Sequence, residues 1–148
     1  MQKELLLEML AQNKLTCSYA FDRITDENSA LRLNRQTASI GFIYRHIGET
    51  MNLFGFFFGI PTDVQNSTME QQDIGQQFDL EISHQYVAQG YEMLKTLVAD
   101  SPDSAWLDPV HTPFFGTVSK MRLFSHILFH TSHHAGQISL TLAKGQFE

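Results

Sequence analysis

Apolar residues recur at three- and four-residue steps along four long segments of the chain, at about residues 2–24, 36–58, 79–100 and 119–144. This spacing is typical of amphipathic helices that each turn one face toward a core. The second segment has the clearest pattern, and its inner face would carry Ile43, Ile47, Thr50, Met51, Phe54 and Phe58. Gly145 follows the last segment as a candidate C-terminal cap. Alternating β-branched residues are nearly absent, so the pattern favours an all-α protein.

The connections between these helices also carry information. The stretches 59–78 and 101–118 hold all four prolines and are longer than the few residues that join neighbours in a simple up-down bundle. Connections of this length allow a crossover between helices that are not adjacent, or a lid over one end of the bundle. We therefore predict a single domain over residues 1–148, an all-α four-helix bundle with long crossover connections.

The last connection contains three large aromatic residues, Trp106, Phe114 and Phe115. Aromatic side chains in a long loop bury much apolar surface, so this connection should pack against the bundle. It would form either a flap over an opening or a plug that seals the core.

Composition narrows the range of functions. The net charge is −6 and the ten Lys and Arg residues are scattered, whereas a nucleic-acid binder needs a clustered basic face. The apolar stretch 51–60 is too short and too broken by glycine to cross a bilayer, and the N-terminal residues resemble helix turns more than a signal peptide. Cys17 is the only cysteine, which fits a reducing cytoplasm and a role as a small packing residue.

The clearest chemical signal is a run of histidines in the last helical segment. His126, His130 and His134 stand four residues apart, and His133 lies beside them. Two imidazoles four residues apart on a helix can bind one divalent metal ion. His126 and His134 are separated by a rise of about 12 Å, too far for both to bind one ion. The spacing leaves His126 with His130, His130 with His134, or, third, His130 with His133.

A metal site needs at least one further ligand. His46 lies midway along the second segment, on the side that carries Ile43 and Phe54, where a buried imidazole needs a polar partner that a metal would supply. We expect His84 and His111 to be exposed to solvent, with His111 alternatively near the mouth of the site. The competing interpretation is that the histidines make ordinary hydrogen bonds or form a polar helix–helix or subunit contact.

The stretches SIGFIYRHIGETMNLF and LFSHILFHTSHHAGQI together resemble the DinB/YfiT-like family, a superfamily of four-helix bundles that are candidate metalloenzymes. Members carry a histidine midway along the second helix and a final-helix motif His-x-x-x-His-x-Gly-Gln, which residues 130–137 match. The resemblance covers nearly the whole chain. It implies that the metal ligands are His46, His130 and His134. Ala135 stands where many relatives have Arg.

The same resemblance implies a crossover in the bundle and a homodimer. Characterised relatives include thiol-dependent transferases and isomerases that use low-molecular-weight thiols. Within the motif, Gly136 would let a neighbouring helix approach closely, and Gln137 would hydrogen-bond to a group behind the metal.

These observations predict a three-histidine site for Zn²⁺ or Ni²⁺ in a cytoplasmic protein that acts on a small molecule, with no nucleic-acid or membrane partner. Three neutral imidazoles leave the charge of the ion in place, so it would acidify a bound water or thiol. Metal-bound water would make the protein a hydrolase, and a metal-bound thiolate would make it an S-transferase.

Glu49, one turn after His46, is a candidate general base or a carboxylate behind a metal ligand, although a Glu is more often a solvated charge on the outer face. Two further functions stay open. One is a stress-related protein that binds a metal or ligand without turnover. The other is a dimerisation bundle whose histidines only pack.

Overall fold

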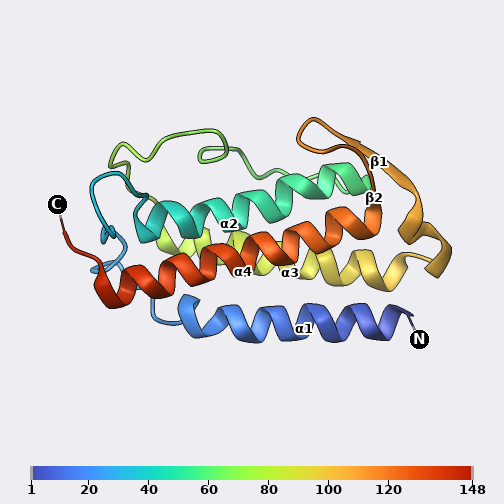
Figure 1. Ribbon diagram of the computed structural model, residues 1–148, viewed down its shortest axis with the longest axis horizontal. Helices are drawn as coiled ribbons and strands as arrows, with labels where there is room; N and C mark the ends of the chain where they lie inside the picture. The colour runs from blue at the N-terminus through green and yellow to red at the C-terminus, as the bar shows by residue number, and fades with distance from the viewer. Residues whose placement is uncertain (1, 148) are drawn as a thin grey trace.

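The computed structural model describes residues 2–147, and four helices lie side by side along its length (Figure 1). They are α1 (Gln2–Phe21), α2 (Ile40–Phe54), α3 (Leu80–Asp100) and α4 (Lys120–Lys144). Both α1 and α2 pack mainly on α3 and α4, so α1 and α2 occupy opposite corners of the bundle. The chain runs one way along α1 and α4 and the other way along α2 and α3 (Figure 1). The all-α bundle with a crossover is confirmed.

The crossover is the connection between α2 and α3. It begins with the 3-10 helix η1 (Gly55–Phe58) and then runs back along the outside of the bundle, so that α3 starts at the same end as α2 (Figure 1). Parallel neighbours require such a return, which explains the length of this connection. The return stretch passes beside α2 and is therefore available to contribute side chains to a site on that helix.

Capping side chains set where the helices begin. Ser39, Asp79 and Ser119 each accept a hydrogen bond from the backbone N–H three residues later. The second helix was predicted from residue 36 but starts only after Ser39, because Thr37 hydrogen-bonds back to Asn34 in a turn. The first helix ends at residue 21 rather than 24.

Gly145 caps α4 as predicted, with its N–H 2.7 Å from the carbonyl oxygen of Thr141. Its backbone is extended rather than left-handed. Glycine is needed because a Cβ at this position would lie 2.5 Å from the same oxygen.

The segment 101–118, predicted as a loop, contains regular structure. It forms the 3-10 helix η2 (Asp103–Leu107) and a hairpin of β1 (Pro109–Thr112) and β2 (Gly116–Ser119). Val110 pairs with Val118 across the hairpin, and both side chains are buried. A two-stranded hairpin is marginal alone, so this one depends on the apolar face that it packs on the bundle.

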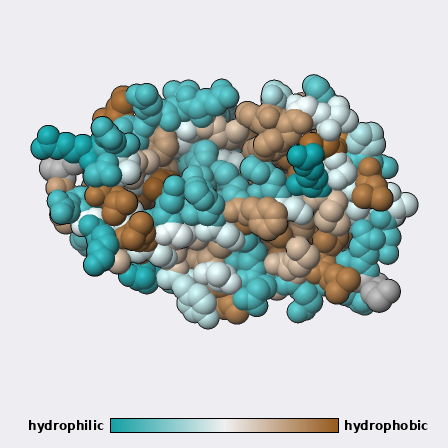
Figure 2. Space-filling model, in the orientation of Figure 1, coloured by the Kyte–Doolittle hydropathy of each residue, from teal (hydrophilic) through white to brown (hydrophobic). Residues whose placement is uncertain are grey.

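The three aromatic residues of this segment divide between the two predicted roles. Trp106 is 1% exposed and packs edge-on against Phe124, with the ring centroids 5.4 Å apart, so it seals the core. Phe114 and Phe115 lie in the hairpin turn and are partly exposed. Phe114 packs beside Phe54 at the end of α2, with the ring centroids 5.6 Å apart. Figure 2 shows hydrophobic groups gathered at the upper right of the molecule.

The core runs through the centre of the bundle, where all four helices contribute apolar side chains. Fully buried members include Cys17, Ile47, Met51, Leu94, Val98, Leu123, Ile127 and Ile138. Cys17 is thus a packing residue, as expected. None of the helices within residues 2–147 combines the length and apolar character needed to span a membrane.

Candidate metal centre

Three imidazoles from two helices converge at the middle of the bundle. Nε2 of His130 lies 3.0 Å from Nε2 of His46 and 3.1 Å from Nε2 of His134. The three ligand atoms all lie within 4.8 Å of one another. His130 and His134 are one turn apart on α4, and His46 faces them from α2, which runs antiparallel alongside. The structure therefore brings together the three histidines that the family resemblance implies.

A chain of hydrogen bonds fixes the proton on the His46 ring. The Thr68 hydroxyl lies 2.6 Å from a carboxylate oxygen of Glu49 and 3.3 Å from Nδ1 of His46. A carboxylate only accepts, so Thr68 donates to Glu49 and must accept from His46. His46 is therefore protonated at Nδ1, and its Nε2 turns a lone pair toward the other two rings.

The His134 ring is oriented in the same way by a different partner. Its Nδ1 lies 2.6 Å from the side-chain oxygen of Gln137, an acceptor, so Nδ1 carries the proton and Nε2 offers a lone pair. The prediction that Gln137 supports the site is compatible with this contact. Gln137 follows His134 by three residues on the same helix, which places the two side chains next to each other.

His130 is the least satisfied ring of the three. Its Nδ1 is buried and has no hydrogen-bond partner, and its Nε2 faces the lone pairs of both neighbours. A single Nε2–H can satisfy only one of those lone pairs. One cation at the point of convergence would satisfy all three nitrogens, so the residues present fit a divalent metal ion.

Burial also keeps these rings in the neutral form that binds metal. Desolvation, followed by the charges of neighbouring histidines, lowers the pKa of His130 to about 2. The pKa of His46 falls to about 4 for the same reasons, partly opposed by the negative charge of Glu49. Desolvation likewise lowers the pKa of His134. All three imidazoles are consequently neutral at neutral pH, so none of them has to lose an acidic proton before it can bind a metal.

Glu49 corrects one expectation. A solvated charge was the more common role for such a residue, yet Glu49 is 0% exposed. Its two oxygens accept hydrogen bonds from the backbone N–H and the hydroxyl of both Ser67 and Thr68. Both oxygens thus accept hydrogen bonds from the crossover connection, and the role of general base stays a prediction for Glu49. It holds Thr68 in place behind His46.

Ser67 and Thr68 were not identified from the sequence. They lie in an irregular connection without periodicity, and nothing in their spacing connects them to residue 49. A Ser-Thr pair in a loop is a common turn signal, and it gives no indication that a buried carboxylate is its partner.

The remaining histidines of α4 lie outside the cluster. The His126 ring is half-buried between Phe115 and Phe54, at centroid distances of 4.6 and 5.7 Å. Its centroid is 5.8 Å from that of His130. His133 is exposed. Of the pairs that spacing left open, only His130 with His134 belongs to the group of converging ligand atoms.

The two histidines expected at the surface differ from each other. His111 is exposed on β1, as expected. His84 is half-buried instead, because the Tyr44 hydroxyl lies 2.7 Å from its Nδ1 and the two rings pack edge to face. Neighbouring polar residues along the sequence suggested exposure for His84, whereas its own helix face is turned toward α2.

The motif residues between the ligands also need one correction. A Cβ built on Gly136 would meet no atom within 4 Å, so Gly136 does not serve a close helix approach in the described chain. Ala135, which stands where many relatives have Arg, is buried in the core and brings no charged group to this position.

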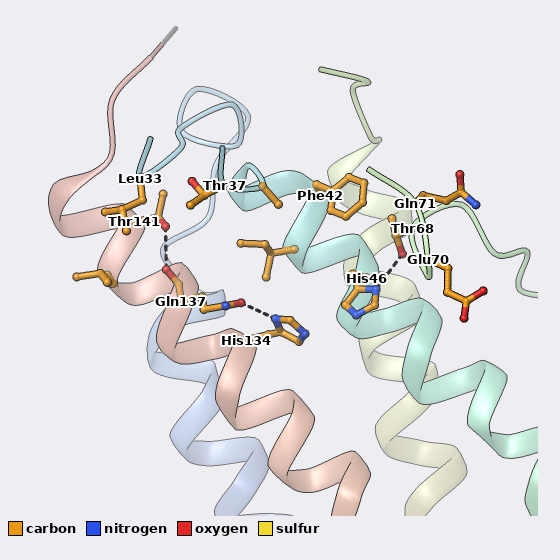
Figure 3. A pocket seen from close by; sticks show the side chains of 13 residues that line it. Leu33, Thr37, Phe42, His46, Thr68, Glu70, Gln71, His134, Gln137 and Thr141 are labelled. Carbon is orange, nitrogen blue, oxygen red and sulfur yellow. Dashed lines mark hydrogen bonds between the residues drawn. The ribbon is translucent and has the colours of Figure 1, made fainter. Parts of the chain in front are cut away.

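A pocket of about 430 Å³ opens beside the histidine cluster (Figure 3). It lies between the beginning of α2 and the end of α4, and the crossover connection borders it. His46 and His134 form part of its wall. A small molecule in this pocket would therefore contact the side of the cluster formed by those two rings.

Together, the fold and the site define a helical-bundle protein with a three-histidine cluster at the edge of a pocket. The chain belongs to the DinB superfamily, whose family model matches residues 9–138. No protein of curated function matches the sequence.

Two solved structures are similar in fold. One is YfiT from Bacillus subtilis, described as a probable metal-dependent hydrolase with an unusual four-helix bundle topology. It is 14% identical, with a TM-score of 0.72, over 96% of this chain and 86% of YfiT. The other is TT2238, a four-helix bundle protein, at 12% identity and a TM-score of 0.67 over 93% of this chain and 98% of TT2238.

Proposed function

We propose that His46, His130 and His134 bind one divalent metal ion, Zn²⁺ or Ni²⁺, and that the protein is a metal-dependent hydrolase of a small molecule. The observation that carries this proposal is the convergence of three Nε2 atoms, two of them with lone pairs fixed by hydrogen bonds at Nδ1. Imidazole is a preferred ligand of both metals. The description of YfiT as a probable metal-dependent hydrolase is consistent with the proposal.

Each residue of the site has a distinct task in this function. A divalent ion held by three neutral imidazoles supplies Lewis acidity toward a water molecule or a polarised carbonyl. Thr68 and Glu49 keep the His46 ring protonated on Nδ1, and Gln137 does the same for His134. The pocket wall holds the substrate against the face formed by His46 and His134.

A second candidate is a thiol-dependent S-transferase that uses a low-molecular-weight thiol. The hydrogen bonds of Glu49 favour it, because both carboxylate oxygens already accept from Ser67 and Thr68, and a proton taken from water would compete with those bonds. A thiol, with an ordinary pKa of about 8.5, ionises without such help far more readily than water. The same observation is compatible with a protein that binds metal or ligand without turnover.

Metal analysis of protein purified without a histidine tag tests the site. We expect one ion per chain after titration with Zn²⁺ or Ni²⁺, and its loss in His130→Ala. The control is His111→Ala, which removes an exposed histidine of the hairpin and should retain the ion. Wild-type metal content in His130→Ala would contradict the proposal.

The activity is tested separately with the metal-loaded protein. Hydrolysis of neutral esters and amides, with no thiol present, is the expected result. Turnover that requires both an added thiol and an electrophile would instead identify the transferase. An ion bound at full stoichiometry with neither activity would favour a binding protein.

A further inference from the structure

The wall of the pocket beside the histidines has a distinctive charge pattern. Five of its residues are apolar: Leu33, Ala38, Phe42, Ile43 and Leu140. No lysine or arginine lines it, and apart from the two histidines its only ionisable residue is Glu70. Figure 2 shows hydrophobic groups on this side of the molecule, near the end of α4.

The arginine nearest in sequence to the wall already has partners within the protein. Arg32 precedes the lining residue Leu33, and its guanidinium lies 2.6 Å from Asp73 and 2.8 Å from the backbone oxygen of Thr37. A negatively charged ligand would therefore lose water without gaining a cationic partner from the wall, and Glu70 would repel it. The body of an anionic molecule is disfavoured here.

Among the polar residues of the wall, Gln137 offers a hydrogen-bond donor to a ligand. The side-chain oxygen of Gln137 accepts from His134, which leaves the Gln137 amide N–H groups for a ligand. The hydroxyl hydrogens of Thr68 and Thr141 are used by Glu49 and by the Gln137 backbone oxygen, so neither hydroxyl can donate to a ligand. A ligand with an uncharged acceptor, such as a carbonyl, can accept a hydrogen bond from the Gln137 amide.

We infer that the pocket selects a small molecule with an uncharged, mainly apolar body and a carbonyl acceptor, in the chemical class of neutral esters and amides. The volume of about 430 Å³ lies in the lower part of the range that small-molecule sites occupy. The inference rests on the proposed function only for the part of the ligand that faces the histidines, where the reaction would occur. The charge and polarity of the rest of the ligand are inferred from the pocket wall alone.

Binding to the metal-free protein tests this selectivity without depending on the ion. The probes are three benzamides of similar size that carry a methyl group, a carboxylate or an aminomethyl group opposite the amide. Dissociation constants come from chemical-shift titration, with His46 and Gln137 signals as the reporters. We expect the methyl compound to bind at least about tenfold more tightly than the carboxylate, a difference of about 1.4 kcal/mol.

A charge-reversing variant makes the test specific to the wall. Leu140→Lys adds a cation to the pocket, at a position that is already 50% exposed, and should tighten binding of the carboxylate probe severalfold. Leu107→Lys adds the same charge on η2, outside the pocket, and should leave all three constants unchanged.

Three results would overturn the inference. The first is that the wild type binds the carboxylate probe as tightly as the methyl probe, or more tightly. The second is that Leu140→Lys and Leu107→Lys have the same dissociation constants for the probes. The third is that no probe binds. Metal titration of the same preparation reports on the proposed function independently. A protein that binds metal but fails this test loses only the substrate class, and one that selects the neutral probe without binding metal loses only the metal site.

Discussion

The two turns of α4 on either side of His130 place chemically identical side chains in very different surroundings. One turn before it, His126 lies against Phe54 and Phe115, in the half of the bundle closed by the hairpin. One turn after it, His134 meets Gln137 and faces His46 at the wall of the pocket. A regular spacing of histidines therefore does not by itself distinguish a ligand from a packing residue. The residues that neighbouring elements bring to each turn make that distinction.

The largest expected effect separates these two histidines directly. His134→Ala removes a proposed ligand atom and should weaken metal binding by about 100-fold or more. Loss of a residue that only hydrogen-bonds to a ligand weakens binding by about 10- to 100-fold, and loss of the ligand itself should cost at least as much. His126→Ala removes a ring outside the cluster and should change the affinity by less than about threefold. Competition titration with a chromophoric chelator measures both. Equal losses in the two variants would mean that His126 also binds the ion.

The support behind His46 gives the next largest effect. Thr68→Val keeps the shape of the side chain but removes the hydroxyl between His46 and Glu49, so metal affinity should fall by about 10- to 100-fold. The matched control is Thr50→Val on α2, because the Thr50 hydroxyl is buried without a hydrogen-bond partner. That control should keep the affinity and be as stable as the wild type or more so. An unchanged affinity in Thr68→Val would show that the His46 ring needs no such support.

His126 and His134 should differ in their effect on metal binding but have the same effect on how the free energy of unfolding depends on pH. Desolvation lowers the folded-state pKa of both His126 and His134 below the unfolded value of about 6.5. Between those values the unfolded chain binds more protons, so the free energy of unfolding of the metal-free protein decreases as the pH falls below about 6.5. His46 extends this loss down to a pH of about 4.

Denaturant midpoints between pH 7.5 and pH 4.5 measure this dependence. Both His126→Gln and His134→Gln should flatten it, because each removes a group whose pKa is lowered on folding. A steeper dependence in either variant would contradict the assigned direction of the shift.

The smallest expected effect concerns the turn that carries His134. Gly136 lies within α4 with open space around its missing side chain, so Gly136→Ala should raise the free energy of unfolding by about 0.5–1 kcal/mol. Gly90→Ala on α3 is the opposite case, because its Cβ would lie 2.6 Å from Cβ of Met51, and it should destabilise the protein. Thermal denaturation distinguishes the two. A loss of metal affinity in Gly136→Ala would indicate that the backbone of this turn must move.

The helices and the three converging histidines could be predicted from the sequence for different reasons. Periodicity identified all four helices, because a face that packs on a core must repeat every three or four residues. Spacing along α4 narrowed the candidate ligands to pairs that contain His130, and the family resemblance selected His134 and His46 from the candidates. The hairpin was missed, although Val110, Thr112 and Val118 around a Pro-x-x-Gly turn are a recognisable strand signal.

The side chains that surround the converging histidines could not be predicted from the sequence in the same way. The burial of Glu49 depends on the crossover connection returning along α2, and periodicity within α2 carries no information about what passes over its outer side. The contact between His84 and Tyr44 likewise depends on the packing of α3 against α2. Such contacts between distant segments follow from topology, which local patterns constrain only weakly.

The distance along the chain between His46 and His130, 84 residues, has a consequence for biosynthesis. A nascent chain that ends before α4 contains only one of the three converging histidines, so it has no centre in which to capture an ion. Under the proposed function, an ion would enter the three-histidine centre only after the last helix has docked between α1 and α2, a long-range step of the kind that slows folding. Metal uptake during refolding would therefore report the completion of the bundle rather than its early stages.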